Sequence, residues 1–94
     1  KYRFHIVSGS DQEELRYLCK ELDIYQYFLS IHGSPTPKKQ LVKNVLETNQ
    51  YLVSETCLIG DSINDYEAAK DNQIYFLAYN NVLIEQLSDV KPMF

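Results

Sequence analysis

The chain alternates between strand-like and helix-like segments along almost its whole length. Apolar, β-prone runs occupy residues 2–8, 28–32, 56–59 and 74–79. Helix-like patterns separate them, beginning near residue 11 and covering 38–49 and 64–72. The connections are too long for hairpins, so the strands are expected to lie parallel with helices on both faces of the sheet. The order therefore predicts one doubly wound, three-layer α/β/α domain over residues 1–94.

Local patterns refine this expectation. Ser10 and Glu13 fit an S-x-x-E capping box at the start of the first helix. That helix carries a stripe of apolar residues spaced to face the core: Leu15, Leu18, Cys19 and Leu22. The second helix has a similar stripe: Leu41, Val42, Val45 and Leu46. The run at 56–59 is apolar after its first residue, which predicts burial on both faces. Residues 82–87 fit a short last helix.

Composition narrows the classes of function. The net charge is −4 and the basic residues are scattered, which argues against a nucleic-acid partner. No apolar run is long enough to span a membrane, and the first residues lack the pattern of a signal peptide. Cys19 and Cys57 have no metal-ligand spacing and are expected to be buried free thiols in the cytoplasm, although the sequence does not exclude a disulfide. His5 and His32 are expected to be ordinary strand residues.

Polar clusters follow three of the predicted strands. They lie at residues 8–10, 34–38 and 60–65, all at or just beyond a strand's carboxyl end. Because the carboxyl ends of parallel strands share one edge of a sheet, these clusters are expected to converge on one ligand site.

The residue types in these clusters suit phosphate chemistry. Asp61 and Asp65 offer the hard carboxylate oxygens that Mg²⁺ prefers. Ser8 supplies a hydroxyl, and the backbone N–H groups of Gly9 and Ser10 precede a helix N-terminus, which favours an anion. Lys38 adds a cation that can neutralise a phosphate. Together they form a set suited to phosphoryl transfer, which depends on positioning and charge neutralisation.

Three stretches resemble motifs of the haloacid dehalogenase superfamily of phosphatases. They are HIVSGS, GSPTPK and LIGDSINDYEAA, and the resemblance as a whole covers residues from about 4 to about 79. The resemblance implies that Ser8 contacts the transferred phosphoryl group and that Lys38 stabilises it, with Lys39 as the second choice. It also implies that Asp61 ligates Mg²⁺ and that Asp65 ligates it or holds its water shell. A small phosphorylated metabolite is the implied substrate.

The first motif of that superfamily, DxDx(T/V), is absent. No Asp in the chain is followed two positions later by another Asp. The chain is therefore expected to be the C-terminal part of a hydrolase, without the nucleophile strand and any cap domain, and to be inactive alone. In the superfamily that strand lies between those ending at Ser8 and Gly60. Their open edges are expected to pair with each other, to dimerise, or to accept a further segment.

Other interpretations remain beside the phosphatase. A degenerate module of the same superfamily would keep the phosphate or metal site for regulation or scaffolding, without catalysis. Asp61 and Ser62 are also candidates to cap the helix over 64–72 without any further role. A phospho-receiver domain is a weaker alternative, because its acidic pair and acceptor Asp do not occur in the right order. An EF-hand loop fails, since Ile63 cannot ligate Ca²⁺.

Overall fold

The computed structural model describes residues 2–79, 86 and 91–92. The elements follow in the order β1 (His5–Asp11), α1 (Gln12–Glu21), η1 (Tyr25–Tyr27), β2 (Ser30–Ser34), α2 (Lys38–Asn49), η2 (Val53–Glu55), β3 (Cys57–Gly60), α3 (Ile63–Asp71), β4 (Tyr75–Ala78) and β5 (Lys91–Pro92). The alternation of strands and helices expected from the sequence is confirmed. The helix expected over 82–87 lies outside the described residues, and β5 was not expected.

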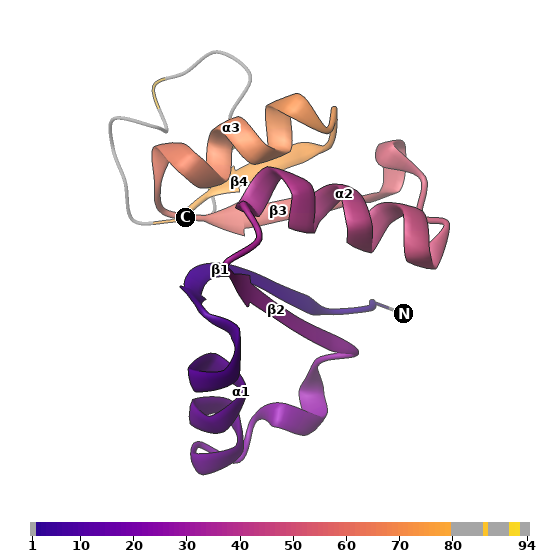
Figure 1. Ribbon diagram of the computed structural model, residues 1–94. Helices are drawn as coiled ribbons and strands as arrows, with labels where there is room; N and C mark the ends of the chain where they lie inside the picture. Colours follow the sequence, from indigo (N-terminus) through magenta and orange to yellow (C-terminus); the bar gives the residue numbers. More distant parts are fainter. Residues whose placement is uncertain (1, 80–85, 87–90, 93–94) are drawn as a thin grey trace.

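All the strand pairs are parallel, as the long connections predict (Figure 1). The described strands form two sheets, β1–β2 and β3–β4–β5. Among the described residues no pairing joins β1 to β3, so the expectation that these strands close onto each other is wrong. Pairing of their edges with a second copy or with a further segment stays a prediction. The fold is thus a parallel α/β arrangement that is divided into two sheets.

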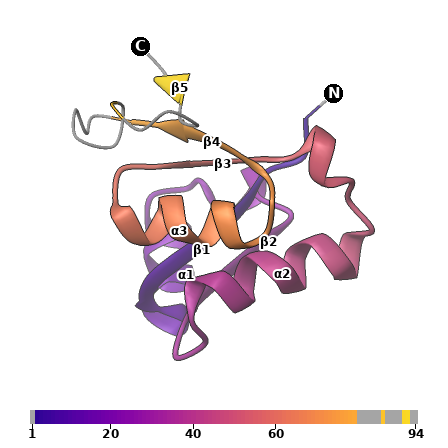
Figure 2. The same cartoon turned by 90° about the horizontal axis from the view of Figure 1, so that it is seen from above.

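Helices join the two sheets. In Figure 1, α1 lies on one side of the β1–β2 sheet and α2 lies on the other, where it runs beside α3. Figure 2 shows α2 and α3 together beneath β3 and β4. The main core fills this space, and its buried residues come from α2, α3, β4 and the position just before β4: Val42, Leu46, Ala68, Ala69, Ile74, Phe76 and Ala78. Val7 of β1 and Leu58 of β3 pack against it, so one core serves both sheets.

Within the part of the chain that the structure describes, one face of the β3–β4 pair is covered and the other is not. Along β3 the side chains alternate between half-buried and exposed, and Ile59 is 49% exposed. On β4, Tyr75 is 57% exposed, whereas Phe76 is buried. The expected burial of the 56–59 run on both faces is therefore wrong. The reason is that α2 and α3 pack on the same side of these strands, and no described element covers the other side.

Helix α1 begins differently from the expectation. β1 continues through Asp11, and the Asp11 carboxylate accepts a 3.1 Å hydrogen bond from the Glu14 N–H. Asp11 is therefore the N-cap, and the capping box proposed for Ser10 and Glu13 is wrong. The expected stripe is only partly buried. Cys19 is 2% exposed, but Leu18 and Leu22 are 50% and 60% exposed.

Helix α2 matches its expected bounds. Pro37 occupies the N-cap, and the helix ends at Gln50 in the left-handed conformation. Leu41, Val42 and Leu46 are buried, in agreement with the expected stripe, and Val45 is half-buried.

The two cysteines differ in exposure. Both are free thiols, and Cys19 is buried as expected, but Cys57 is exposed at the start of β3. Among the described residues, no helix combines the length and the apolar character that crossing a membrane requires.

Candidate functional site

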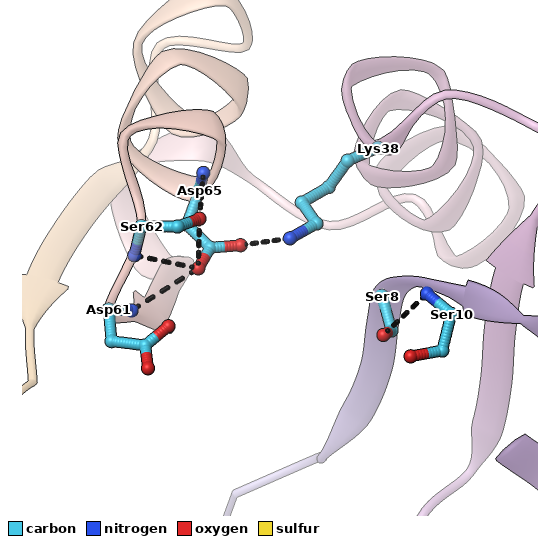
Figure 3. Close-up of polar contacts among 6 residues, drawn as sticks. All are labelled: Ser8, Ser10, Lys38, Asp61, Ser62 and Asp65. Carbon is cyan, nitrogen blue, oxygen red and sulfur yellow. Dashed lines mark hydrogen bonds and ion pairs between the residues drawn. The ribbon is translucent and has the colours of Figure 1, made fainter.

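The expected polar residues come from three segments near the carboxyl ends of strands. Ser8 lies in β1, Lys38 is the first residue of α2, Asp61 directly follows β3, and Asp65 lies in the first turn of α3. Figure 3 shows the Lys38 side chain extending toward α3, with Ser8 on the neighbouring part of β1. The division of the sheet therefore still leaves these segments in one region of the molecule.

Lys38 and Asp65 form an ion pair. Lys38 Nζ lies 2.5 Å from Asp65 Oδ1, and their side chains are 19% and 11% exposed. Low exposure strengthens the attraction between the charges, and it also makes each charge costly without its partner. The neighbouring lysine does not share this position, because Lys39 pairs with Asp71 at 3.7 Å and is largely exposed.

The second oxygen of Asp65 is held by the turn that follows β3. Asp65 Oδ2 accepts hydrogen bonds from the backbone N–H groups of Asp61 and Ser62, both at 3.2 Å. The Ser62 hydroxyl also donates to it at 2.9 Å. In return the Asp65 N–H donates to Ser62 Oγ at 3.1 Å, which completes a capping box at the N-terminus of α3. Ser62, not Asp61, is therefore the N-cap.

Gly60 is required by this arrangement. A Cβ on Gly60 would overlap the carboxylate, Cγ and Cβ of Asp65. The backbone of β3 thus ends against the Asp65 side chain with no room for a methyl group. The φ angle of Gly60 is not in the left-handed region, so the constraint is close approach rather than backbone conformation.

Asp61 has different surroundings. The backbone N–H of Asp61 donates to Asp65 Oδ2, but the residue is exposed at the end of β3. The two aspartates expected to share a metal therefore have different surroundings. Asp65 has both oxygens engaged by protein donors, whereas the Asp61 side chain points away from that hydrogen-bond network (Figure 3).

The segment around Ser8 departs from regular strand geometry. Val7 pairs with His32 and Asp11 with Ser34, so β1 carries extra residues between these two positions. Within this irregular stretch the Ser10 N–H donates to Ser8 Oγ at 3.1 Å. Such bulges redirect side chains at the end of a strand. Gly9 is exposed, with open space where a side chain would be.

A side chain that sequence reasoning missed joins the first two loops. Gln12 Oε1 accepts a 3.2 Å hydrogen bond from the N–H of Gly33, at the end of β2. A Cβ on Gly33 would overlap the Ser10 carbonyl oxygen, so the ends of β1 and β2 touch. Gln12 thereby fixes the β1–α1 turn against the loop that leads to Lys38. No signal in the sequence distinguishes this glutamine from an ordinary first-turn residue.

The role of Ser62 did leave a signal. Ser62-x-x-Asp65 has the spacing of a capping box with Asp in place of Glu, directly after an apolar run.

Among the described residues there is no group of three or more His, Cys, Asp or Glu side chains arranged to hold a metal ion.

Comparison with known proteins gives the family. The sequence profile described as haloacid dehalogenase-like hydrolase matches residues 1–79. No protein of curated function matches the chain. Two solved structures share its fold. One is a haloacid dehalogenase-like family hydrolase from Streptococcus pneumoniae, with 24% identity over 96% of this chain and a TM-score of 0.82.

The other solved structure is the core domain of a candidate phosphoglycolate phosphatase from Streptococcus pneumoniae TIGR4. It is 17% identical over all of this chain and 90% of its own length, with a TM-score of 0.66. The chain spans about half, 48%, of the length of the first structure. Since the family profile covers most of the chain and both structures share its fold, the chain belongs to the haloacid dehalogenase-like hydrolase family.

Proposed function

We propose that this chain forms the phosphate- and metal-binding part of a Mg²⁺-dependent phosphomonoester hydrolase that acts on a small phosphorylated metabolite in the cytoplasm. The observation that carries the proposal is the ion pair between Lys38, at the start of α2, and Asp65, in the first turn of α3. Asp61 lies beside this pair, and Ser8 lies in β1. A fixed cation next to an exposed carboxylate and a half-buried hydroxyl group is suited to stabilise a phosphoryl group. Membership of the hydrolase family supports the same conclusion.

Lys38 is the residue proposed to neutralise the phosphoryl group. Its ammonium carries three donor hydrogens, and one of them is engaged by Asp65 in the ion pair. Asp65 thus acts as a positioning residue that sets the direction of Lys38. The Ser8 hydroxyl and the Gly9 N–H are proposed to bind phosphate oxygens, at the exposed end of β1.

The carboxylates fit Mg²⁺ in part. Mg²⁺ keeps several waters and takes one or two protein carboxylates together with substrate phosphate, so it needs no cluster of three side chains. The exposed carboxylate of Asp61 suits such an ion. Asp65 would have to share Oδ1 with Lys38, since Oδ2 already accepts three hydrogen bonds. We therefore propose that Asp61 is the direct Mg²⁺ ligand and that Asp65 holds the water molecules around the ion. When bound, Mg²⁺ would supply positive charge against the phosphate.

The nucleophile is proposed to come from outside these 94 residues. The aspartyl-phosphate route requires a carboxylate in line with the phosphorus atom, and the chain contains no DxD sequence. The edges of β1 and β3 have no strand partner between them among the described residues. A strand there would bring its carboxyl end to the region of Ser8, Lys38 and Asp61.

A hydrolysis assay tests the proposal. The 94-residue chain and a longer polypeptide from the same reading frame are incubated with p-nitrophenyl phosphate, with and without Mg²⁺. The longer polypeptide is expected to show Mg²⁺-dependent turnover and the 94-residue chain none. In the longer polypeptide, Lys38→Ala is expected to lower kcat/KM by about 10²–10³-fold, as does removal of other preorganised charges. Lys39→Ala is the matched control and should stay near the unaltered rate, because Lys39 faces Asp71.

Each other outcome has a definite meaning. Unchanged turnover in Asp61→Asn would remove the metal assignment. Turnover by the 94-residue chain itself, if it depended on Lys38, would overturn the argument about the nucleophile. A longer polypeptide that binds phosphate and Mg²⁺ without turnover would contradict the enzyme and favour the non-catalytic module.

A further inference from the structure

A chain of four polar side chains ties the C-terminal end of α2 to the β1–β2 sheet. His5 Nε2 lies 2.7 Å from the Tyr51 hydroxyl oxygen, and His5 Nδ1 lies 2.6 Å from Ser30 Oγ. His32 Nε2 approaches the same Ser30 oxygen at 2.8 Å. All four side chains are half-buried. Two imidazoles thus share one hydroxyl group, and none of the four residues belongs to the proposed phosphate site.

Geometry fixes these groups in register. His5 of β1 is paired with Ser30 of β2, and His32 follows on the same face of the sheet two residues later. Tyr51 follows Gln50, the C-cap of α2, and its N–H donates to the Leu46 carbonyl at 3.0 Å. The rings of His5 and Tyr51 also meet edge to face, with 5.4 Å between their centroids. The chain therefore joins two strands and the end of a helix.

The numbers of donors and acceptors allow these four hydrogen-bonded side chains to hold one extra proton. A hydroxyl donates one hydrogen and accepts two, while a neutral imidazole donates from one nitrogen and accepts at the other. If one ring is charged, it donates to Ser30, whose hydroxyl then donates to the neutral ring. Every contact keeps a donor and an acceptor, whichever of His5 and His32 carries the proton.

A second proton leaves both contacts to Ser30 Oγ in place, but charge repulsion and the loss of an acceptor for the hydroxyl hydrogen oppose it. With His5 and His32 both charged, both rings donate to Ser30 Oγ and the hydroxyl hydrogen loses its acceptor within the chain. Two cations then flank one oxygen, and their repulsion is weakly screened because the groups are half-buried. The Arg16 guanidinium adds a third positive charge near His32 from α1.

We propose that His5, Ser30, His32 and Tyr51 form a pH-sensitive clamp, which holds the end of α2 on the sheet with up to one extra proton and opens when both histidines are charged. Burial and the neighbouring positive charges also disfavour the charged form of both histidines. Burial, followed by the charge of His32, lowers the pKa of His5 below the ordinary 6.5. Burial, followed by the charge of Arg16, lowers the pKa of His32. The clamp does not depend on the proposed phosphatase activity.

The sign of the pH effect follows from these shifts. Histidines with a lowered pKa in the folded state bind fewer protons there than in the unfolded chain. The stability they contribute is complete above pH 6.5 and is lost as the pH falls below 6.5. For each extra proton bound by the unfolded chain, the unfolding equilibrium constant rises by up to about tenfold per pH unit.

Histidine NMR on the 94-residue chain tests the proposal. The ring Cε1–H signals are followed from about pH 8 to about pH 5, the range in which histidine titrates. Both rings are expected to titrate in two coupled steps that lie below pH 6.5, since strongly interacting groups lose their protons as a pair. In His32→Gln, His5 is expected to titrate in one step at higher pH than in the unaltered chain. An unchanged His5 titration in this variant would overturn the proposal.

Two further variants keep the test decisive. Tyr51→Phe removes the link to α2 but leaves both imidazoles on Ser30, so the coupling should persist while the protein becomes less stable at every pH. If His32→Gln fails to fold, His5→Gln gives the reciprocal measurement on His32, because coupling between two sites is mutual. Independent single steps for both rings in the unaltered chain would also refute the clamp.

Discussion

Lys38 of α2 and Asp65 of α3 meet with 2.5 Å between Nζ and Oδ1, and this contact joins the N-terminal ends of the two helices that share the core. Asp65 also closes the turn after β3 through its other oxygen. One carboxylate thus connects the β3–α3 turn, the start of α2 and the candidate phosphate site.

Asp65→Asn is expected to destabilise the chain by about 2–4 kcal/mol. It leaves the poorly exposed Lys38 ammonium without its counter-charge and weakens charge-assisted hydrogen bonds. Asp61→Asn is the matched control, with an expected loss within about 1 kcal/mol because that side chain is exposed. Urea unfolding followed by circular dichroism measures both. Equal losses would contradict the distinction between the two aspartates.

Gly60→Ala is expected to cost about 1–3 kcal/mol, as overpacking usually does. The new methyl group would overlap the Asp65 side chain, which is fixed by its hydrogen bonds and cannot move aside. Gly9→Ala is the control on the other strand end, where nothing lies within 4 Å of the added atom. Thermal unfolding of the two variants side by side gives the comparison. A Gly60→Ala protein as stable as Gly9→Ala would show that the turn adapts.

Ser62→Ala is expected to lose about 1–2 kcal/mol of stability, because it removes the side-chain half of the capping box of α3 and the hydrogen bond from the hydroxyl to Asp65. Ser10→Ala should change stability by less than about 0.5 kcal/mol, since α1 is capped by Asp11. Chemical denaturation again provides the measurement. The reverse ranking would restore the cap that the sequence pattern assigned to Ser10.

The two thiols are expected to react in separate phases with a thiol reagent such as Ellman's reagent. Cys57 is exposed and should react at once, whereas Cys19, 2% exposed, should react only when the protein unfolds. Cys57→Ser should remove the fast phase and leave the slow one. Prompt reaction of both thiols without denaturant would contradict the packing of α1 against β2.

The parts predicted correctly are those set by local chemistry. Helix α2 has its start fixed by Pro37 and its buried face fixed by regular apolar spacing, so its bounds agree with the prediction. The parallel pairing follows from the lengths of the connections. The start of α1 was placed one residue early because Ser10 and Asp11 are both good N-caps, and only the actual end of β1 distinguishes them.

The errors come from contacts between distant segments. An apolar run such as 56–59 does not tell which element will cover each face, and here one face of β3 has no described neighbour. Likewise, Leu18 and Leu22 have the spacing of core residues, but α1 packs along only part of that stripe. The division into two sheets depends on strand pairing, which periodicity does not encode.

For the candidate site, the sequence indicated which residues gather but not how they are linked. Lys38 and Asp65 were assigned to separate tasks, on the phosphate and on the metal. Their direct contact depends on the relative placement of α2 and α3, which no local spacing specifies. Gln12 was missed for the same reason, because its partner Gly33 lies on another strand.

The space between the two sheets has a mechanical consequence. Ser8 belongs to the β1–β2 unit and Asp61 to the β3–β4–β5 unit, so their separation is set by how far apart the two units stand. Among the described residues that separation is set by the core on which Val7 of β1 and Leu58 of β3 both pack. A segment that paired with the open edges of β1 and β3 would therefore act as a spacer that sets the width of the ligand site, even through residues that never touch a ligand.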